Sequence, residues 1–278
     1  MFDLIRDYRV LFVGDGIIDE YVYVSALSKS PKEHLIVTKW EGFESFRGGV
    51  WAASGHLRGF VKVVHVCAGG MVTVKRRFVD PVYLRKLFEV QMDKPGVRGE
   101  AVLGDWDLVV VTDFGHGALD GFDLSGARYL AINVQTNASN FGFNLVTKYD
   151  KADFCVCDEP EARLAAHDRV SPIRDVMQRL RDNHFEKLIV THGSFGAYGL
   201  DNTGFYHVPA FTDKVVDTMG AGDAFFSITA PLAKAGVSMP ELLRIGNAAG
   251  ALKTQIVGHR NHVTKEALVE FLQTCKTH

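Results

Sequence analysis

The sequence has no long uninterrupted apolar run, and its first seven residues contain Asp3 and Asp7 where a secretory signal would have a basic and then an apolar segment. A membrane-spanning helix needs about 18 or more consecutive apolar residues. These two absences predict a protein that neither crosses a membrane nor enters the secretory route. We therefore expect a cytoplasmic location.

Cysteine is also scarce, with 4 in 278 residues, at positions 67, 155, 157 and 275. So few and so scattered cysteines cannot form the disulfide framework of a secreted domain, and the composition suits a reducing compartment. Cys155 and Cys157 have no second Cys or His pair at zinc-site spacing. We expect them to pack in a core.

The chain lacks an excess of either charge, because 31 basic and 33 acidic residues give a net charge of −2. No sequence-wide basic field would draw it to nucleic acid or to an anionic membrane. Walker P-loop, Gly-x-Gly-x-x-Gly and Ser-His-Asp patterns are absent as well, which argues against a P-loop enzyme, a dinucleotide oxidoreductase and a hydrolase. The expected partner is a small molecule.

Short apolar runs rich in β-branched residues alternate with segments of helical spacing. Such alternation predicts an α/β fold in which helices cover a mostly parallel sheet. No linker or repeat divides the chain, so residues 1–278 are expected to form a single domain. The predicted strands lie at 10–13, 61–66, 108–111, 129–134, 154–156 and 188–190, and the predicted helices near 50–58, 159–167, 171–183, 222–235, 239–254 and 264–275.

Residues 20–48 interrupt this alternation and resemble a β-hairpin insertion, with a strand expected at 35–40. An isolated two-stranded ribbon is marginally stable, so a hairpin with exposed aromatic residues either covers a site as a lid or pairs with another subunit. A second lid ribbon is expected at roughly 70–90, and its pairing partner is not evident from the sequence.

Polar residues recur directly after the predicted strands. In open α/β sheets, ligands bind outside the carboxyl ends of the strands, so these residues are candidates for a binding site. They are Asp15, Asp19, Asp113, Asn133, Asp158, Glu161 and Thr191.

The strongest local signal is residues 217–223, Asp-Thr-Met-Gly-Ala-Gly-Asp, followed by an apolar helical segment. Gly220 and Gly222 permit a tight turn, and a helix that begins near Ala221 would direct unpaired N–H groups at an anion. Asp223 would then lie in the first helical turn, where it could accept a proton from a hydroxyl as a bond to phosphorus forms. The pattern predicts a phosphoryl-transfer site.

This heptad resembles the signature of the PfkB/ribokinase family of sugar and nucleoside kinases. Other pieces resemble, in order, the heptose-7-phosphate kinase domain of the bifunctional ADP-heptose synthases. These pieces are residues 13–21, Ser30-Pro31, Gly48-Gly49, Asp113 with residues 117–119, and residues 246–250.

The resemblance implies a ribokinase-like three-layer α/β/α sandwich with a small β lid. It also implies the activity of these kinases. The reaction would be ATP-dependent transfer to a hydroxyl of a sugar or sugar phosphate, with the anomeric hydroxyl of a heptose 7-phosphate as the most specific expectation. ATP and Mg²⁺ would be required, a monovalent cation stays open, and the lid would form a homodimer.

The resemblance also assigns roles to residues. Asp223 would be the catalytic base, and Gly220, Ala221 and Gly222 would form the anion hole. Substrate would be held by Asp15, Asp19, Gly48, Gly49, Asp113 and Lys75; nucleotide by Thr191, Gly193, Gly196, Asp217 and Asn247; and the metal, through water, by Glu161 and Asp158.

The chain departs from the family's pattern at several places. Ala52 and its neighbours stand where an Asn usually follows the Gly pair, Asp158 replaces an Asn, residues 133–135 read Asn-Val-Gln in place of Asp-Pro-Lys, and Ile228 occupies a position that is normally small. About thirty residues are missing between Val66 and Asp113. Two alternatives therefore stay open: a ligand-binding or regulatory protein that kept the fold and lost turnover, and a nucleoside kinase.

Overall fold

The computed structural model describes residues 1–96, 103–211 and 215–274, and its main feature is one ten-stranded sheet. The strand order is β10-β9-β8-β7-β6-β5-β1-β3-β4, and β2 pairs with β1 outside this path. The strands are β1 (Arg9–Lys29), β2 (Ile36–Gly49), β3 (Val63–Val79), β4 (Lys86–Pro95), β5 (Leu108–Asp113), β6 (Leu130–Val134), β7 (Ala152–Asp158), β8 (Phe185–Thr191), β9 (Ala197–Asp201) and β10 (Gly204–Val208).

The centre of the sheet is parallel, as predicted. β1 pairs in parallel with β3 and β5, and the parallel pairing continues through β6 and β7 to β8. Every residue of β5 and β6 is buried, because both faces of these strands are covered. Parallel strands buried on both sides need apolar side chains throughout, which explains their Val, Ile and Leu content.

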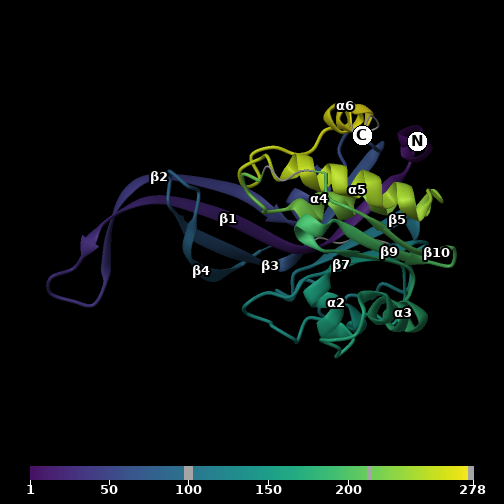
Figure 1. The fold of residues 1–278 in the computed structure, drawn as a ribbon, viewed down its shortest axis with the longest axis horizontal. Coiled ribbons are helices and arrows are strands. Elements are labelled where there is room, and N and C mark those ends of the chain that lie inside the picture. The colour runs from purple at the N-terminus through teal and green to yellow at the C-terminus, as the bar shows by residue number, and fades with distance from the viewer. Residues whose placement is uncertain (97–102, 212–214, 275–278) are drawn as a thin grey trace.

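Helices cover both faces of this sheet (Figure 1). α4 (Ala221–Lys234), α5 (Met239–Lys253) and α6 (Lys265–Thr274) lie on one side, and α1 (Val50–Gly55) contacts α4. α2 (Glu159–Ala165) and α3 (Ile173–His184) lie on the other side. All six helices stand where helical spacing predicts them, and the three-layer α/β/α architecture is confirmed.

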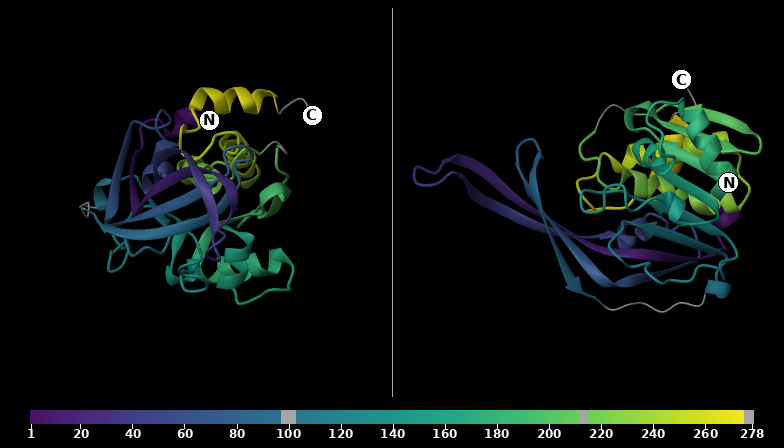
Figure 2. Two further views of the ribbon diagram at one scale, coloured as in Figure 1. Left: turned by 90° about the vertical axis from the view of Figure 1, so that its left-hand side faces the viewer. Right: turned by 90° about the horizontal axis from the view of Figure 1, so that it is seen from below.

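The lid is larger and more continuous than a hairpin insertion. β1 does not end at the edge of the core but runs on as one strand of 21 residues, and β3 does the same over 17 residues. We call residues 16–29 of β1, β2, residues 72–79 of β3 and β4 together the lid. β4, antiparallel to β3, is the partner that the sequence left unidentified. Figure 2 shows the two hairpins projecting from the helical body.

A register shift marks the boundary between core and lid. Gly14 pairs with Ala68 on β3, whereas Gly16 pairs with Val72, so β3 has two more residues than β1 between these pairs. Asp15 lies at this irregularity. A bulge bends the strand and redirects a side chain, and here it separates the core part of each strand from its lid part.

The shortened region between Val66 and Asp113 leaves the sheet intact. Its described residues form the rest of β3, β4 and a short 3-10 turn, Leu103–Asp105, and contain no α-helix. β1 still lies directly between β3 and β5.

Two strands were not predicted. β9 and β10 form a hairpin at the sheet edge, antiparallel to β8. Each has five residues and includes a glycine, Gly199 or Gly204, so neither makes an apolar run.

Cys155 and Cys157 are buried in β7, which agrees with core packing; Cys275 lies outside the described residues. In the parts of the chain that are described, no helix has the length and apolar character needed to cross a membrane.

Candidate active site

The heptad forms a tight turn that leads into α4. Gly220 is the N-cap residue with φ of +74°, a left-handed conformation that favours glycine, and the N–H of Ala224 donates the first helical bond to its carbonyl. Within the described residues, the N–H groups of Gly220, Gly222 and Asp223 have no acceptor. The N–H of Ala221 differs from the expectation, because it donates to Thr218 O at 3.3 Å. The turn thus presents unpaired amides to one side.

Asp223 is buried in the first turn of α4. Its Oδ1 accepts a hydrogen bond of 2.9 Å from Gln135 Nε2, and Gln135 also donates to Asn133 Oδ1 at 3.0 Å. Burial raises the pKa of Asp223, while His259, Gln135 and Lys253 act against this rise. Gln135, which the sequence marked only as a departure, therefore holds the candidate base in place.

Asp19 lies in the lid part of β1 and is almost completely buried. Its carboxylate forms an ion pair with Arg77 of β3, and His259 Nε2 lies 3.3 Å from its Oδ2. Burial alone would raise the pKa of Asp19, but the hydrogen bond from His259 and the charge of Arg77 outweigh it and lower the pKa. A β-carbon at Gly48 would collide with Asp19 Oδ2, so a larger residue would displace this carboxylate.

Asp15 is held by main-chain groups. Its two oxygens accept hydrogen bonds from Phe114 N at 2.7 Å and Ala118 N at 3.0 Å, in the loop that follows β5. Burial raises the pKa of this carboxyl, and Asp113 adds to the rise. Gly49, next to Gly48, has φ of +56°, and a β-carbon there would strike Asp15 O. Asp15 thus fixes the Phe114–Ala118 loop against the bulge.

Lys75 is buried in the lid part of β3, and no hydrogen-bond or ion-pair partner is found for it among the described residues. Burial and the nearby Arg77 lower the pKa of its amine, whereas Asp19, Glu89 and Asp15 favour the charged form. Asp19 also acts on Asp223. Lys75, Asp19 and Asp223 therefore belong to one electrostatic neighbourhood, which joins the lid to α4.

Asp113 ends β5 and is already paired. It forms an ion pair with Lys148 and accepts hydrogen bonds from Tyr149 OH at 2.6 Å and Asn144 Nδ2 at 3.1 Å. With Asn140, Asn144 and Lys148 it lines a cavity of about 290 Å³.

Asp158 and Glu161 cap α2. Asp158 Oδ1 accepts from Glu161 N at 2.7 Å, and Glu161 Oε2 accepts from Asp158 N at 2.8 Å, a reciprocal capping box. Glu161 Oε1 also accepts from Thr136 N. Burial, followed by the charge of Asp158, raises the pKa of Glu161 to about 8, and Asp223 contributes to this rise. The groups around Glu161 thus do not offset the effect of burial and of Asp158 on its pKa.

The residues expected at the nucleotide lie on a second part of the same edge. Thr191 ends β8, and the next turn has left-handed glycines, Gly193 with φ of +51° and Gly196 with φ of +93°. A β-carbon at Gly196 would collide with Val208 O. Asn247 of α5 donates to Val208 O at 2.8 Å and to Pro209 O at 3.0 Å, so it fastens α5 to the end of β10.

Asp217 joins the lid to the core. Tyr21 OH of β1 donates to its Oδ2 at 2.9 Å, and Lys86 Nζ of β4 lies 2.9 Å from its Oδ1. From the core, Gly258 N and Met219 N donate to the same carboxylate at 2.9 Å and 3.1 Å. Although burial alone would raise it, the Lys86 and amide hydrogen bonds lower the pKa of Asp217 to about 2.

Several residues of this region were not predicted. Arg77 and His259 bind Asp19, and Lys253 lies fully buried beneath the heptad turn. Arg77 could have been suspected from the basic run at 75–77. A lysine at the end of an apolar helical segment is not distinguishable from a solvated helix terminus without the fold.

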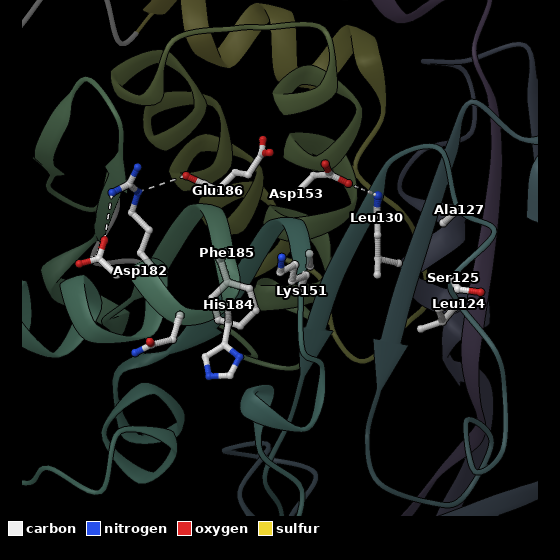
Figure 3. Close-up of a pocket in the computed structure, with 13 residues that line it drawn as sticks. Leu124, Ser125, Ala127, Leu130, Lys151, Asp153, Asp182, His184, Phe185 and Glu186 are labelled. Atoms are coloured by element: carbon white, nitrogen blue, oxygen red, sulfur yellow. Dashed lines mark hydrogen bonds and ion pairs between the residues drawn. The ribbon is translucent and has the colours of Figure 1, made fainter.

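The larger surface groove lies elsewhere. A hollow of about 480 Å³ is lined by Leu130, Asp153, Arg181 and Glu186 among others, at the amino ends of β6, β7 and β8 (Figure 3). Arg181 donates to Glu186 O, and Asp153 accepts from Leu130 N. Because α/β sheets bind ligands at the opposite, carboxyl edge, this groove is not the candidate site.

An Asp217→Asn change tests the lid attachment. The amide keeps the shape but loses the charge that Lys86 binds, so we expect the free energy of unfolding at pH 7 to fall by roughly 1.5–3 kcal/mol, the usual range for hydrogen bonds to a charged group. A lowered pKa stabilises the fold above the unfolded value and is lost on acidification. The difference between variant and wild type should therefore shrink as the pH falls from about 4 toward about 2.

Denaturant titration at several pH values measures both effects. Asp7→Asn, the same change at an exposed carboxylate, is the control and should leave stability unchanged. An Asp217→Asn protein as stable as the wild type at pH 7 would contradict the attachment.

Comparison with known proteins relates this geometry to a family. Residues 136–266 match the pfkB family carbohydrate kinases. The bifunctional protein HldE of Shewanella baltica is 26% identical over 311 residues, an alignment that covers 95% of this chain and 63% of that protein. The chain thus spans less than two thirds of the length of the curated relatives it matches.

Solved structures agree on the fold. A ribokinase from Thermotoga maritima superimposes with a TM-score of 0.70 at 17% identity, covering 96% of this chain and 99% of that one. Phosphofructokinase-2 from Escherichia coli, in complex with potassium, superimposes with a TM-score of 0.67 at 15% identity, covering 97% and 99%. Residues 136–266 thus resemble the pfkB family carbohydrate kinases, and the chain as a whole has a ribokinase-like fold.

Proposed function

We propose that this chain transfers the terminal phosphoryl group of ATP to a hydroxyl of a sugar phosphate, within a single kinase domain that includes the lid. The observation that carries the proposal is the buried Asp223 in the first turn of α4, beside the unpaired amides of Gly220 and Gly222 and within the electrostatic reach of Asp19. A base, an anion-binding turn and a polar acceptor site meet there.

The chemistry follows from these positions. The acceptor oxygen attacks the terminal phosphorus, the bond between that phosphorus and its bridging oxygen breaks, and ADP leaves with the electron pair. The hydroxyl proton passes to Asp223, whose raised pKa brings it closer to the pH of the reaction. The amides of Gly220 and Gly222 stabilise the negative charge on the phosphoryl oxygens.

Nucleotide would lie along the edge formed by Thr191, Gly193, Gly196 and Asn247. Mg²⁺ would neutralise phosphate charge when bound. Asp158 and Glu161 fit an indirect role, through water, because their oxygens already accept main-chain N–H groups. The raised pKa of Glu161, caused first by burial and then by Asp158, supports a nearby cation. Potassium, named with the Escherichia coli phosphofructokinase-2, is a second ion to be considered.

The acceptor would lie between the lid and α4. Asp19 can accept hydroxyl donors near Gly48, and Asp15 and Gly49 shape the floor of the site beside them. Asp113 would border the acceptor through its cavity. The unpaired ammonium of Lys75 suits a phosphate group, since a buried cation gains most from an anion that reaches it. Heptose 7-phosphate, phosphorylated at its anomeric hydroxyl, is the specific acceptor we infer from the HldE relatives.

Asp223→Asn tests the base. The change keeps the shape of the side chain and removes its basicity, so turnover should fall by about 10²–10⁴. ADP release measured over hexoses, heptoses, their phosphates and nucleosides identifies the acceptor in the wild type. Asp7→Asn, an exposed exchange of the same kind, should leave turnover unchanged.

Three results of that screen would contradict parts of the proposal. Equal turnover in Asp223→Asn and wild type would contradict the assignment of Asp223 as the base. Preference for a nucleoside would replace the sugar phosphate. Binding of nucleotide in calorimetry with no ADP release from any acceptor would favour a regulatory protein.

Lys75→Met tests recognition of the acceptor's phosphate. A hydrogen-bonded charge pair lost from a buried site is worth about 1.5–3 kcal/mol, so the KM for a phosphorylated acceptor should rise roughly 10- to 150-fold. The KM for ATP should not change. Lys94→Met, an exposed lysine on the neighbouring strand β4, is the control. Equal KM values for the phosphorylated acceptor in wild type and Lys75→Met would contradict this role.

We further propose that the lid forms a homodimer. Its outermost part is a two-stranded arm of β1 and β2 that extends away from the body (Figure 1). Large apolar side chains are exposed on it, including Leu27, Ile36, Trp40 and Phe43. Because a two-stranded ribbon with exposed apolar residues is marginal alone, a second copy of the chain is the partner that fits a fold of this kind.

Trp40→Glu tests this pairing. A charge in an apolar contact between arms is unfavourable, so sedimentation velocity should show a shift from dimer to monomer. Val170→Glu, at a 90% exposed valine between α2 and α3, should keep the wild-type state. A wild-type chain that sediments as a monomer at micromolar concentration would contradict the proposal.

A further inference from the structure

Lys253 is a buried cation that the proposed reaction does not yet use. It is the last residue of α5, and its side chain has no exposure to solvent. Its Nζ donates to two main-chain carbonyls, Met219 O and Gly258 O, each at 2.7 Å. A buried ammonium is costly unless its donors are satisfied, so these carbonyls are arranged around it.

The two carbonyls come from segments that meet at the heptad. Met219 directly precedes the N-cap Gly220, and Gly258 follows α5 with φ of +50°. Asp217 Oδ2 accepts from Gly258 N, and the N–H groups of Val216 and Asp217 donate to Thr254 O. The ammonium thus lies where the heptad turn and the loop after α5 close on each other.

A monovalent cation from solution binds in surroundings of this kind. Main-chain carbonyl oxygens replace the hydration shell of such ions in proteins, and carboxylates nearby balance the charge. The groups that act on Lys253 are Asp217, Asp223 and Asp19, which favour its charged form, and Lys86, which opposes it. His56 and His262, which it affects in turn, lie on the side of α1.

We propose that Lys253 is a built-in monovalent cation: its ammonium occupies the carbonyl oxygens that a potassium or ammonium ion would otherwise bind, so phosphoryl transfer by this chain needs no added monovalent cation. The inference rests on the proposed function and names a positioning residue for it.

A physical link connects this ammonium to the anion-binding turn. The carbonyl of Met219 and the N–H of Gly220 belong to the same peptide group, so a cation on the oxygen polarises that N–H and makes it a stronger donor. The side chain also supports the turn directly, since a β-carbon at Gly220 would lie 3.2 Å from Lys253 Cε. Lys253 therefore acts on the phosphoryl group through Gly220 and not by contact.

The first arm of the test uses the wild-type chain. ADP release and the thermal unfolding midpoint are measured at equal ionic strength in chloride salts of potassium, ammonium, sodium and tetramethylammonium, with MgATP constant. We expect each quantity to agree between the salts, turnover within about twofold. Activation of the wild type by potassium of tenfold or more would overturn the proposal.

The second arm uses Lys253→Met, which leaves the carbonyls without a cation. In tetramethylammonium we expect a lower unfolding midpoint and turnover at least tenfold below wild type, and potassium or ammonium should restore both in part. Lys187→Met is the matched control, because Lys187 Nζ donates to Ala233 O at 2.9 Å at the other end of α4. That variant should show no cation dependence.

The outcomes separate the inference from the proposed function. If no acceptor is phosphorylated, the function fails, and the unfolding midpoints still decide the cation question. A folded Lys253→Met with the same midpoint and turnover in all four salts would overturn the inference. If that variant does not fold, Lys253→Gln takes its place, and if neither folds, the wild-type arm decides.

Discussion

Carboxylates buried at one edge of the sheet are the constraint around which this molecule is arranged. A buried carboxylate is unfavourable unless hydrogen bonds or cations compensate for lost water. Asp15 is compensated by main-chain amides, Asp19 by Arg77 and His259, and Asp217 by Lys86 together with two amides. Burial raises the pKa of Asp15, Asp223 and Glu161 in spite of these partners. Two of these three acids are those proposed for the proton and for the metal's water shell.

The same compensation joins the lid to the core. Two cations of the lid, Arg77 and Lys86, bind these acids and also contact the core segment at 217–219. Arg260 extends the contact by binding Glu44 of β2, at 2.6 Å from Nη2 to Oε2. Because β1 and β3 are continuous from core to lid, a shift of the lid would move Asp19 and Lys75 together. If the acceptor binds at Asp19 and Lys75 as proposed, the contacts of Arg77 and Lys86 would relate its binding to the position of the heptad turn.

Much of the fold could be predicted from the sequence because its signals are local. The buried strands β5 and β6 are apolar runs, and the heptad specifies its own turn through Gly220. The missed features depend on contacts between distant positions. The β9–β10 hairpin has no apolar run, and it becomes a strand pair only beside β8.

The candidate site divides in the same way. Asp223 and Asp15 were both marked as site residues from the sequence, whereas the main-chain partners of Asp15 were not predicted, because Phe114 and Ala118 lie 99 and 103 residues away. Lys253 is a second case. Its two carbonyls come from a turn 34 residues before it and a loop 5 residues after it, and no local pattern marks a lysine for burial.

The departures from the family pattern at residues 133–135 can be explained by electrostatics. Where the family pattern has Asp-Pro-Lys, this chain has Asn-Val-Gln, which removes one negative and one positive side chain and leaves the net charge beside α4 unchanged. Gln135 still donates to Asp223, and it does so as a neutral group that stabilises the carboxylate less than a cation would. A weaker donor permits the raised pKa that burial causes. The positive charge near the turn comes instead from Lys253, which donates to Met219 O. In the proposed reaction, Asp223 would thus serve as the base and Lys253 would polarise the anion-binding turn, with a different placement of charge from the family pattern.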